Sequence, residues 1–355
     1  MMAALVERIA AEIDEVGPLP FEQFMDIALY DPAGGFFATG SLRSARDGDF
    51  LTSAEVSPLF GETIARYVTA VWDRAGRPDE FIVCDVGAGS GSLLEPLLAA
   101  LPFEARAFAV EVSPAARDAF AAGLPQCQVL CGLDELPDAL TGVIVANELL
   151  DNLPMAVAVR ESGSWVERWV GVDAGRLVLV ASPARPAVVG WLERWAGPVP
   201  DGGVVEVQLA ASSWVRSAVE RIERGGLLVF DYGNTAAELS HRRSEGTLRT
   251  YRGHHLGPHP LDEPGTTDIT ADVNFSAMLD AARDRGAEAH LMRQDDFLRA
   301  WGLDDARSTL RARELELART DRILDRMQAR TRFTEADTLM HPRGLGDFRV
   351  LIVEK

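Results

Sequence analysis

The sequence predicts an α/β fold in which helices cover both faces of a parallel sheet. From position 81 onward, short apolar runs alternate with helix-like segments, which is the pattern of successive βαβ units. The first run, residues 81–86, leads directly into a glycine-rich turn and a helix-like segment at 92–101. The chain is also large enough for one big core or two domains, since 47% of its 355 residues are hydrophobic.

The elements can be placed in order from their local signals. Helices with an apolar face or a proline boundary are expected at 3–16, 21–29 and 57–72. Further strands are expected at 105–110, 128–130, 143–146, 227–230, 288–292 and 348–353, and further helices at 113–122, 204–224, 275–285, 295–300 and 308–329. After Pro154 the pattern changes to strict alternation with turn signals at Gly163 and Gly175, which predicts one or two antiparallel hairpins.

These elements suggest a division of the chain into two parts. Residues 1–75 are expected to form an N-terminal helical collar or lid, and residues 76–355 the sheet-containing core. The core carries insertions at about 155–200 (hairpins), 240–274 (a long basic loop) and 293–346 (helices).

Composition and charge exclude several classes of protein. The formal net charge of −19 argues against nucleic acid as a partner. Three cysteines without a CxxC or His/Cys set predict neither a disulfide framework nor a metal site. No apolar run reaches the roughly 18 residues that a membrane span needs, and the first residues lack a signal or transit pattern, so no membrane insertion and a cytoplasmic location are expected.

The glycine turn after the first strand has a specific spacing. Asp85, Gly87, Gly89 and Gly91 form D-x-G-x-G-x-G, whereas a dinucleotide turn would need glycine at the position of Ser92. No Gly-Lys-Ser/Thr follows, so a P-loop is excluded. Because glycines allow close backbone approach and the acid suits a cation, the turn is typical of a site for S-adenosylmethionine (SAM). A turn that only packs helix on strand remains the alternative.

Two further positions extend this cofactor hypothesis. Glu111, with Val112 beside it, ends the next strand 26 residues after Asp85, where a carboxylate can accept both ribose hydroxyls. The alternative for Glu111 is an exposed acid that caps the following helix. Leu133 and Asp134 follow the third strand, where an adenine edge would lie, although Asp134 could equally be an N-cap.

The segment ANELLDNLPM, residues 146–155, places polar side chains beyond the fourth core strand. Open α/β sheets bind ligands at the carboxyl ends of their strands, which is where Asn147, Glu148 and Asp151 lie. Glu148 and Asp151 are three residues apart, so on a helical turn they would face the same way. Acids that interact with a helix dipole are the alternative.

With these motifs in hand, the chain resembles the MidA-type class I SAM-dependent methyltransferases, whose mitochondrial member methylates an arginine of a respiratory complex I subunit. The resemblance rests on the stretches YDPAGGFF, GDFLTSAEVSPLFGE, DVGAGSGSLL, ANELLDNLPM, DYG, GTLRTYRGH, PGTTDITADVNF and GLGDFRVLIV. It implies a seven-stranded, Rossmann-like methyltransferase core, SAM as cofactor, and SAM contacts from Thr52 and Ser53 in addition to the turn and Glu111. Leu149 and Leu150 stand where the family usually has bulky aromatics.

If the acceptor is an arginine, carboxylates would orient its guanidinium and take up the proton that it loses. Glu148 is the first candidate for this role and Asp151 the second, while Asn147 would hold the cofactor or shape the loop. The resemblance also implies a protein substrate, such as a respiratory-complex subunit or another arginine-bearing protein. The oligomeric state is left open, with a homodimer as one option.

Other residues are expected around the acceptor. The walls of the acceptor site could be formed by Tyr30, Tyr232 and Phe36. Phe36 is expected in a flexible loop. Arg252, in the basic loop, would pair acids near the site or contact an acidic partner, and a solvated loop is the alternative. Rival functions are a small-molecule or O-methyltransferase on the same fold, and a SAM-binding assembly factor with little catalysis.

Overall fold

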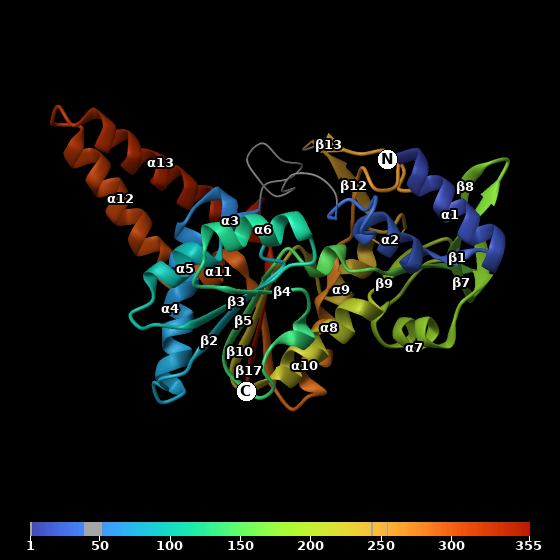
Figure 1. The fold of residues 1–355 in the computed structure, drawn as a ribbon, viewed down its shortest axis with the longest axis horizontal. Coiled ribbons are helices and arrows are strands. Elements are labelled where there is room, and N and C mark those ends of the chain that lie inside the picture. The colour runs from blue at the N-terminus through green and yellow to red at the C-terminus, as the bar shows by residue number, and fades with distance from the viewer. Residues whose placement is uncertain (1, 39–51, 243, 254) are drawn as a thin grey trace.

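A seven-stranded sheet forms the centre of the molecule (Figure 1). The computed structural model describes residues 2–38, 52–242, 244–253 and 255–355, so the first four residues of GDFLTSAEVSPLFGE lie outside it. The strand order is β16-β17-β10-β5-β2-β3-β4, and the strands are β2 (Ile82–Val86), β3 (Arg106–Val110), β4 (Gln128–Leu130), β5 (Leu140–Asn147), β10 (Ile222–Asp231), β16 (Glu288–Arg293) and β17 (Arg349–Glu354). The strands from β4 to β10 are parallel, and β17 runs antiparallel to both of its neighbours.

Helices cover both faces of this sheet, as predicted (Figure 1). One face carries α4 (Leu59–Arg74), α5 (Leu94–Ala100), α6 (Pro114–Gly123) and α11 (Gln294–Ala300), and the other carries α8 (Leu209–Arg221) and α10 (Phe275–Arg283). Alternate residues of one strand serve the two layers: Val83 lies in the cluster of α4, and Cys84 in the cluster of α8. Both faces are therefore buried, which explains why β2 is apolar at every position except Asp85.

A second, antiparallel sheet lies at the end of the molecule that holds the N-terminus (Figure 1). It contains β6 (Ala156–Glu161), β7 (Ser164–Asp173), β8 (Arg176–Pro183), β9 (Val204–Val207) and the short β1 (Leu19–Pro20), with α7 (Pro186–Trp195) between β8 and β9. The turns Ser162-Gly163 and Ala174-Gly175 have positive φ at both residues, which is the geometry of tight hairpins. The predicted hairpins are thus confirmed.

The first two helices pack on this second sheet. Helices α1 (Met2–Val16) and α2 (Phe21–Tyr30) share a buried cluster with residues of β6 and β7, whereas α4 packs on the central sheet. Phe36 is fully buried in the N-terminal cluster, so the prediction of a flexible loop at this position is wrong. The ring of Phe36 is part of the core. The two glycines before it suggested a flexible loop, so this burial was not predicted. The division at position 75 stays a prediction.

Two predicted helices have different bounds in the structure: only residues 209–221 of the first form a helix, α8, and the second is divided into two helices. The expected helix at 204–224 begins instead as strand β9, since the run Val204–Val207 pairs with β6. Its expected terminator, Gly225-Gly226, lies inside β10, where a Cβ at Gly225 would fall 1.8 Å from the Gly142 carbonyl oxygen. The expected helix at 308–329 is a hairpin of α12 (Leu303–Leu317) and α13 (Ile323–Leu339).

The basic loop at 240–274 is more ordered than predicted. It contains a small three-stranded sheet with β12 (Arg249–Arg252) between β13 (His255–Leu256) and β14 (Asp268–Thr270). The short strands β11 (Gly233–Asn234) and β15 (Val273–Asn274) pair in parallel on either side of it in sequence. This brings β14 to the carboxyl edge of the central sheet, beside the segment that follows β5. The remaining short helices are α3 (Ser53–Val56) and α9 (Ala236–Leu239).

Candidate active site

The glycine turn after β2 adopts a conformation that only glycine reaches easily. Gly87, Gly89 and Gly91 have φ values of 75°, 50° and 83°. A Cβ at Gly91 would lie 3.0 Å from the ring of Phe120, and one at Gly87 would lie 3.2 Å from Leu149 Cδ1. The turn is therefore held closely between a helix and the loop after β5, with its backbone facing a pocket.

This pocket brings together five of the eleven predicted cofactor positions, Thr52, Asp85, Gly87, Gly89 and Asn147. It is lined by Thr52, Ala54, Glu55, Asp85, Gly87, Ala88, Gly89, Ser90, Ser92, Leu93 and Asn147. Glu55, Ser90 and Ser92 were not among the predicted residues. The pattern T-x-x-E of Thr52 and Glu55 would have indicated Glu55, because it forms a capping box at the start of α3.

The polar atoms of the pocket fit the cationic parts of SAM. Asp85 is buried, its Oδ2 has no hydrogen-bond partner, and burial, with the charge of Glu111, raises its pKa to about 7. Asn147 Oδ1 is also buried without a partner. Two buried acceptors that lack donors match a ligand that carries an ammonium group, and a carboxylate also suits the positive charge of a sulfonium. Glu111 accepts hydrogen bonds from the amides of Gly89 (3.0 Å) and Ser113 (2.8 Å), so it ties the turn to the end of β3.

Other predicted cofactor residues lie farther from the pocket or point elsewhere. The Ser53 hydroxyl is fully buried against Gln294 of α11, and its backbone amide donates to Glu148 (3.2 Å). Val112 is 54% exposed. Leu133 is half-buried and Asp134 is exposed in a short 3-10 turn after β4. Contacts from Val112, Leu133 and Asp134 to an adenosine remain predictions.

Glu148 occupies a special backbone position at the end of β5. Its φ is 52°, an uncommon value for a residue with a side chain, and its amide donates to the carbonyl oxygen of Phe230 (2.8 Å). The carboxylate accepts from the Ser53 amide and from Asn147 Nδ2 (3.3 Å). Burial, followed by the charge of Asp151, raises its pKa to about 8. Glu148 thus lies between the cofactor pocket and a second group of acids.

Asp151 is the centre of that second group. Its Oδ2 accepts from the hydroxyls of Tyr232 and Thr270 (2.6 Å for Thr270), and these two hydroxyls contact each other. Its Oδ1 is buried without a partner. Burial raises the pKa of Asp151, and the two hydroxyl hydrogen bonds oppose that rise. One oxygen is therefore fixed by the protein while the other has no donor.

Asp231, at the end of β10, holds the backbone around Asp151 and Tyr232 through hydrogen bonds to its carboxylate. Its Oδ2 accepts from the amides of Leu150 (2.9 Å) and Asp151 (3.3 Å), and its Oδ1 accepts from the amide of Tyr232 (2.9 Å). Burial, with the charges of Asp151 and Glu148, raises its pKa well above the usual range. Neither Asp231 nor Thr270 was predicted. The strand ending DYG was a signal for Asp231, but only the folded chain brings Thr270 of β14 to Asp151.

The residues expected around the acceptor do not all meet. Tyr30 donates to the carbonyl oxygen of Asn152 (3.2 Å) and stacks on Phe37, so it lies beside the acid group. Tyr232 contacts Asp151 directly. Phe36 lies in the core of the N-terminal cluster. Arg252 is exposed on β12 and pairs with Glu263, so its role toward a substrate remains a prediction.

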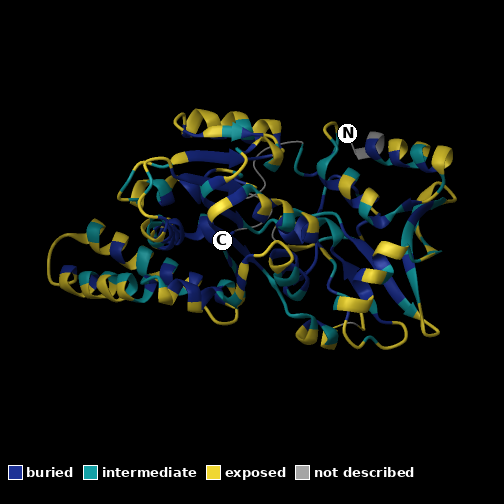
Figure 2. Ribbon diagram, turned by 90° about the horizontal axis from the view of Figure 1, so that it is seen from below, coloured by how far each residue is buried: buried dark blue, intermediate teal, exposed yellow. Residues whose placement is uncertain are grey.

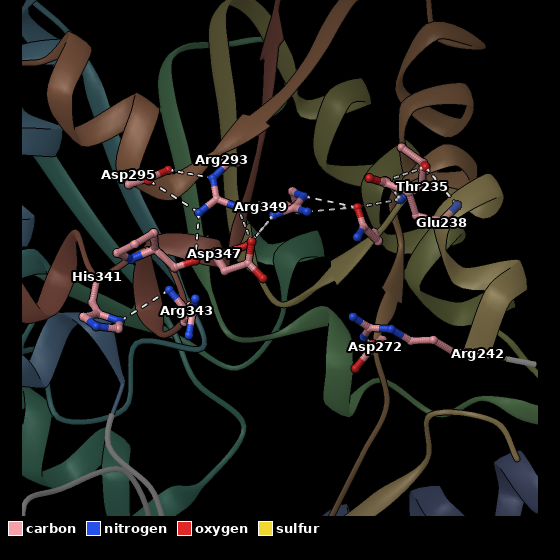
Figure 3. A network of polar contacts seen from close by, with 12 residues as sticks. Thr235, Glu238, Arg242, Asp272, Arg293, Asp295, His341, Arg343, Asp347 and Arg349 are labelled. Carbon is pink, nitrogen blue, oxygen red and sulfur yellow. Dashed lines mark hydrogen bonds and ion pairs between the residues drawn. The ribbon is translucent and has the colours of Figure 1, made fainter.

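Arginines at the edge of the sheet anchor the segment that follows Tyr232. Figure 3 shows Arg293 and Arg349 converging on Asp347 at the ends of β16 and β17. Arg349 also donates to Asn234 Oδ1 (3.1 Å). On the other side of the same view, Arg242 pairs with the buried Asp272, just after β14. The segments that follow Tyr232 and Thr270 are therefore both held by contacts with arginines, at Asn234 and at Asp272.

Comparisons with known proteins agree with this geometry. A family model described as "Putative S-adenosyl-L-methionine-dependent methyltransferase" matches residues 63–292. The mitochondrial protein arginine methyltransferase NDUFAF7 homolog of Drosophila melanogaster is 28% identical over 320 residues, which cover 80% of this chain and 71% of that one. The human mitochondrial protein arginine methyltransferase NDUFAF7 is 24% identical over 382 residues, covering 97% and 81%.

A solved structure is also similar to this chain. A Burkholderia thailandensis crystal structure bound to S-adenosyl-homocysteine is 30% identical, has a TM-score of 0.86, and is matched over 100% of this chain and 92% of that chain. The predicted class I methyltransferase fold and the SAM cofactor are thereby confirmed. In the described part of the chain, no helix has the length and apolar character of a membrane span. The family model extends over more than half of the sequence, and the chain belongs to this family of SAM-dependent methyltransferases.

Proposed function

We propose that the protein transfers a methyl group from SAM to the side chain of an arginine in another protein. The observation that carries this proposal is a group of three carboxylates: Asp151 and Asp231, which are buried, and Glu148, which is half-buried. Within the residues that the structure describes, none of the three forms a salt bridge with an arginine, lysine or histidine. Buried acids without a counter-ion are costly, so a ligand that brings a positive charge would be strongly favoured.

A guanidinium fits this group better than other acceptors. It carries five N–H donors in a plane and stays charged at any ordinary pH. Asp151 Oδ1 lacks a donor, and Glu148 lies next to it on the side of the cofactor pocket. An alcohol or phenol acceptor brings no positive charge and would leave the three acids uncompensated. The names of the relatives, which are protein arginine methyltransferases at 24% and 28% identity, support the same acceptor.

The residues of this chain then have separable roles. When bound, SAM supplies an electrophilic methyl group on a positively charged sulfur. Asp151, held by Tyr232 and Thr270, orients the guanidinium through its remaining oxygen. Glu148 accepts the proton that the acceptor nitrogen loses as its new bond to the methyl carbon forms. Methylarginine and S-adenosyl-homocysteine are the balanced products.

The proposal is tested by identifying the methylated residue. Protein extract from a host strain that lacks the gene is incubated with methyl-labelled SAM and the purified full-length protein. Total hydrolysis and separation of the amino acids should place the label in methylarginine. The Glu148→Gln variant should give no label while it still binds SAM, because it lacks only the proton acceptor.

The other outcomes distinguish the rivals. Label that is released by mild base, or that appears only in small molecules, would replace arginine with an oxygen or small-molecule acceptor. Tight SAM binding without label in any fraction would support a SAM-binding assembly factor. Equal labelling by wild type and Glu148→Gln would remove Glu148 from the chemistry.

A further inference from the structure

The helical hairpin of α12 and α13 projects from the core at the end opposite the antiparallel sheet (Figure 1). Its base is anchored, since Leu303 and Leu339 are buried in the cluster that holds α4 and α11. Farther out, Glu314, Leu317 and Ala329 are the buried residues of the two helices. Most of the remaining hairpin surface is exposed, as Figure 2 shows.

The outer half of the hairpin exposes more apolar surface than packing between its own helices requires. Leu315, Ile323, Leu324 and Met327 are 53%, 68%, 78% and 60% exposed. They are four of the eight large hydrophobic residues that are exposed in the described chain. Leu324 and Met327 also border a groove of about 910 Å³ whose other apolar residues include Leu310 and Leu317. Apolar patches of this kind on a charged surface mark interaction sites.

The charge of the hairpin suggests what covers this patch. The whole chain carries a net charge of −19, so most of its surface repels a second copy. Between positions 303 and 339, however, eight arginines balance eight Asp and Glu residues. This neutral projection is a surface on which two acidic molecules can approach each other.

The distribution of those charges is also self-complementary. In the described residues, Arg319, Arg326 and Arg330 of the outer half form no ion pair, and neither do the exposed acids Asp321 at the tip and Asp305 at the base. If two hairpins lie antiparallel about a twofold axis, the free arginines of one face Asp305 of the other. Twofold contacts of this kind use the same patch on both subunits.

We propose that the α12–α13 hairpin is the dimerisation element of this protein, and that the hairpin of a second copy occupies its groove. Helices of 15 and 17 residues are about 22–26 Å long, which is sufficient for a four-helix bundle. Leu324 and Met327 of each copy would enter the groove of the other. Because the hairpin and the antiparallel sheet lie at opposite ends, contact through the hairpin would leave the end with the antiparallel sheet free (Figure 1).

The experiment compares molar mass by sedimentation equilibrium over a wide range of protein concentration. The full-length wild type should reach twice the 38.5 kDa mass of one chain. The double variant Leu324→Glu/Met327→Glu should weaken the dimer by at least about 30-fold, the effect of losing central interface contacts. Leu256→Glu is the matched control, since Leu256 is 72% exposed on β13 and should leave the dimer unchanged.

A charge-reversal pair tests the arrangement of the two hairpins. Arg326→Glu should weaken the dimer, and Asp305→Arg in the same chain should restore part of the loss. Circular dichroism and SAM binding check that each variant is folded. A monomer at every concentration, or a dimer that the Leu324→Glu/Met327→Glu variant leaves intact, would overturn the proposal. Monomers that bind anionic phosphatidylglycerol vesicles through Leu324 and Met327 would also overturn it, in favour of a lipid surface.

Discussion

The cofactor pocket and the acid group around Asp151 lie next to each other but are built in different ways. The pocket is built mainly on one stretch, residues 85–93, whose backbone conformation comes from glycines, with Thr52, Glu55 and Asn147 also in its lining. The acid group is assembled from the ends of β5, β10 and β14, which are far apart in the sequence. In the pocket, the shape of the backbone limits which ligands can bind. In the acid group, the buried negative charge limits which ligands can bind. Variants should therefore separate cofactor binding from turnover.

The largest separation is expected from Asp151→Asn. The amide keeps the shape and can still accept from Tyr232 and Thr270, but it removes the charge that would orient the acceptor. Turnover should fall by about 10²–10⁴-fold, the range for a lost acid–base or orienting group. The SAM dissociation constant, measured by calorimetry, should change little. Asp138→Asn, at an exposed position, is the control. Equal losses in SAM binding and turnover would show that the two regions act as one.

The opposite separation is expected from Gly91→Ala. A methyl group here meets Phe120 at 3.0 Å and must adopt a φ of 83°. Strain of this type costs about 1–3 kcal/mol, so the unfolding free energy should fall and SAM binding should weaken. Gly123→Ala is the matched control, because a Cβ there meets nothing within 4 Å. If both alanines leave SAM affinity unchanged, the turn has no part in holding the cofactor.

The cofactor pocket could be predicted from the sequence better than the acid group, because its signals are local. The glycine turn, Glu111 and the parallel strands have local signals, and the structure places Asp85, Gly87 and Gly89 in one pocket. Thr270 has no such signal, because it reaches Asp151 only when β14 pairs with β12 at the sheet edge. The strand β9 was read as a helix for the same reason, since its pairing with β6 is not local. Periodicity reports local structure, and pairing between distant segments overrides it.

A smaller effect concerns the pH dependence of stability. Burial raises the pKa of Glu148 from 4.5 to about 8 in the folded protein. Its contribution to stability is therefore complete below the unfolded value and is lost as the pH rises through about 8. Between pH 6 and 9 wild type should lose about 2–3 kcal/mol more than Glu148→Gln does, given about 1.4 kcal/mol per pKa unit over the two pH units from 6 to 8. Urea unfolding at each pH measures the difference. Parallel curves for the two proteins would mean that Glu148 titrates normally.

The smallest change is expected from Thr270→Val, which tests the acid group without altering its charge. The valine keeps the size of the side chain and removes one of two donors to Asp151 Oδ2. A hydrogen bond to a charged group is worth about 1.5–3 kcal/mol, but Tyr232 remains, so turnover should fall only about tenfold. SAM affinity should stay the same, because Thr270 does not line the cofactor pocket. Thr309→Val, on the exposed side of α12, controls for the loss of a hydroxyl. A turnover identical to wild type would show that Tyr232 alone fixes Asp151, and the acid group would then depend on two strand ends instead of three.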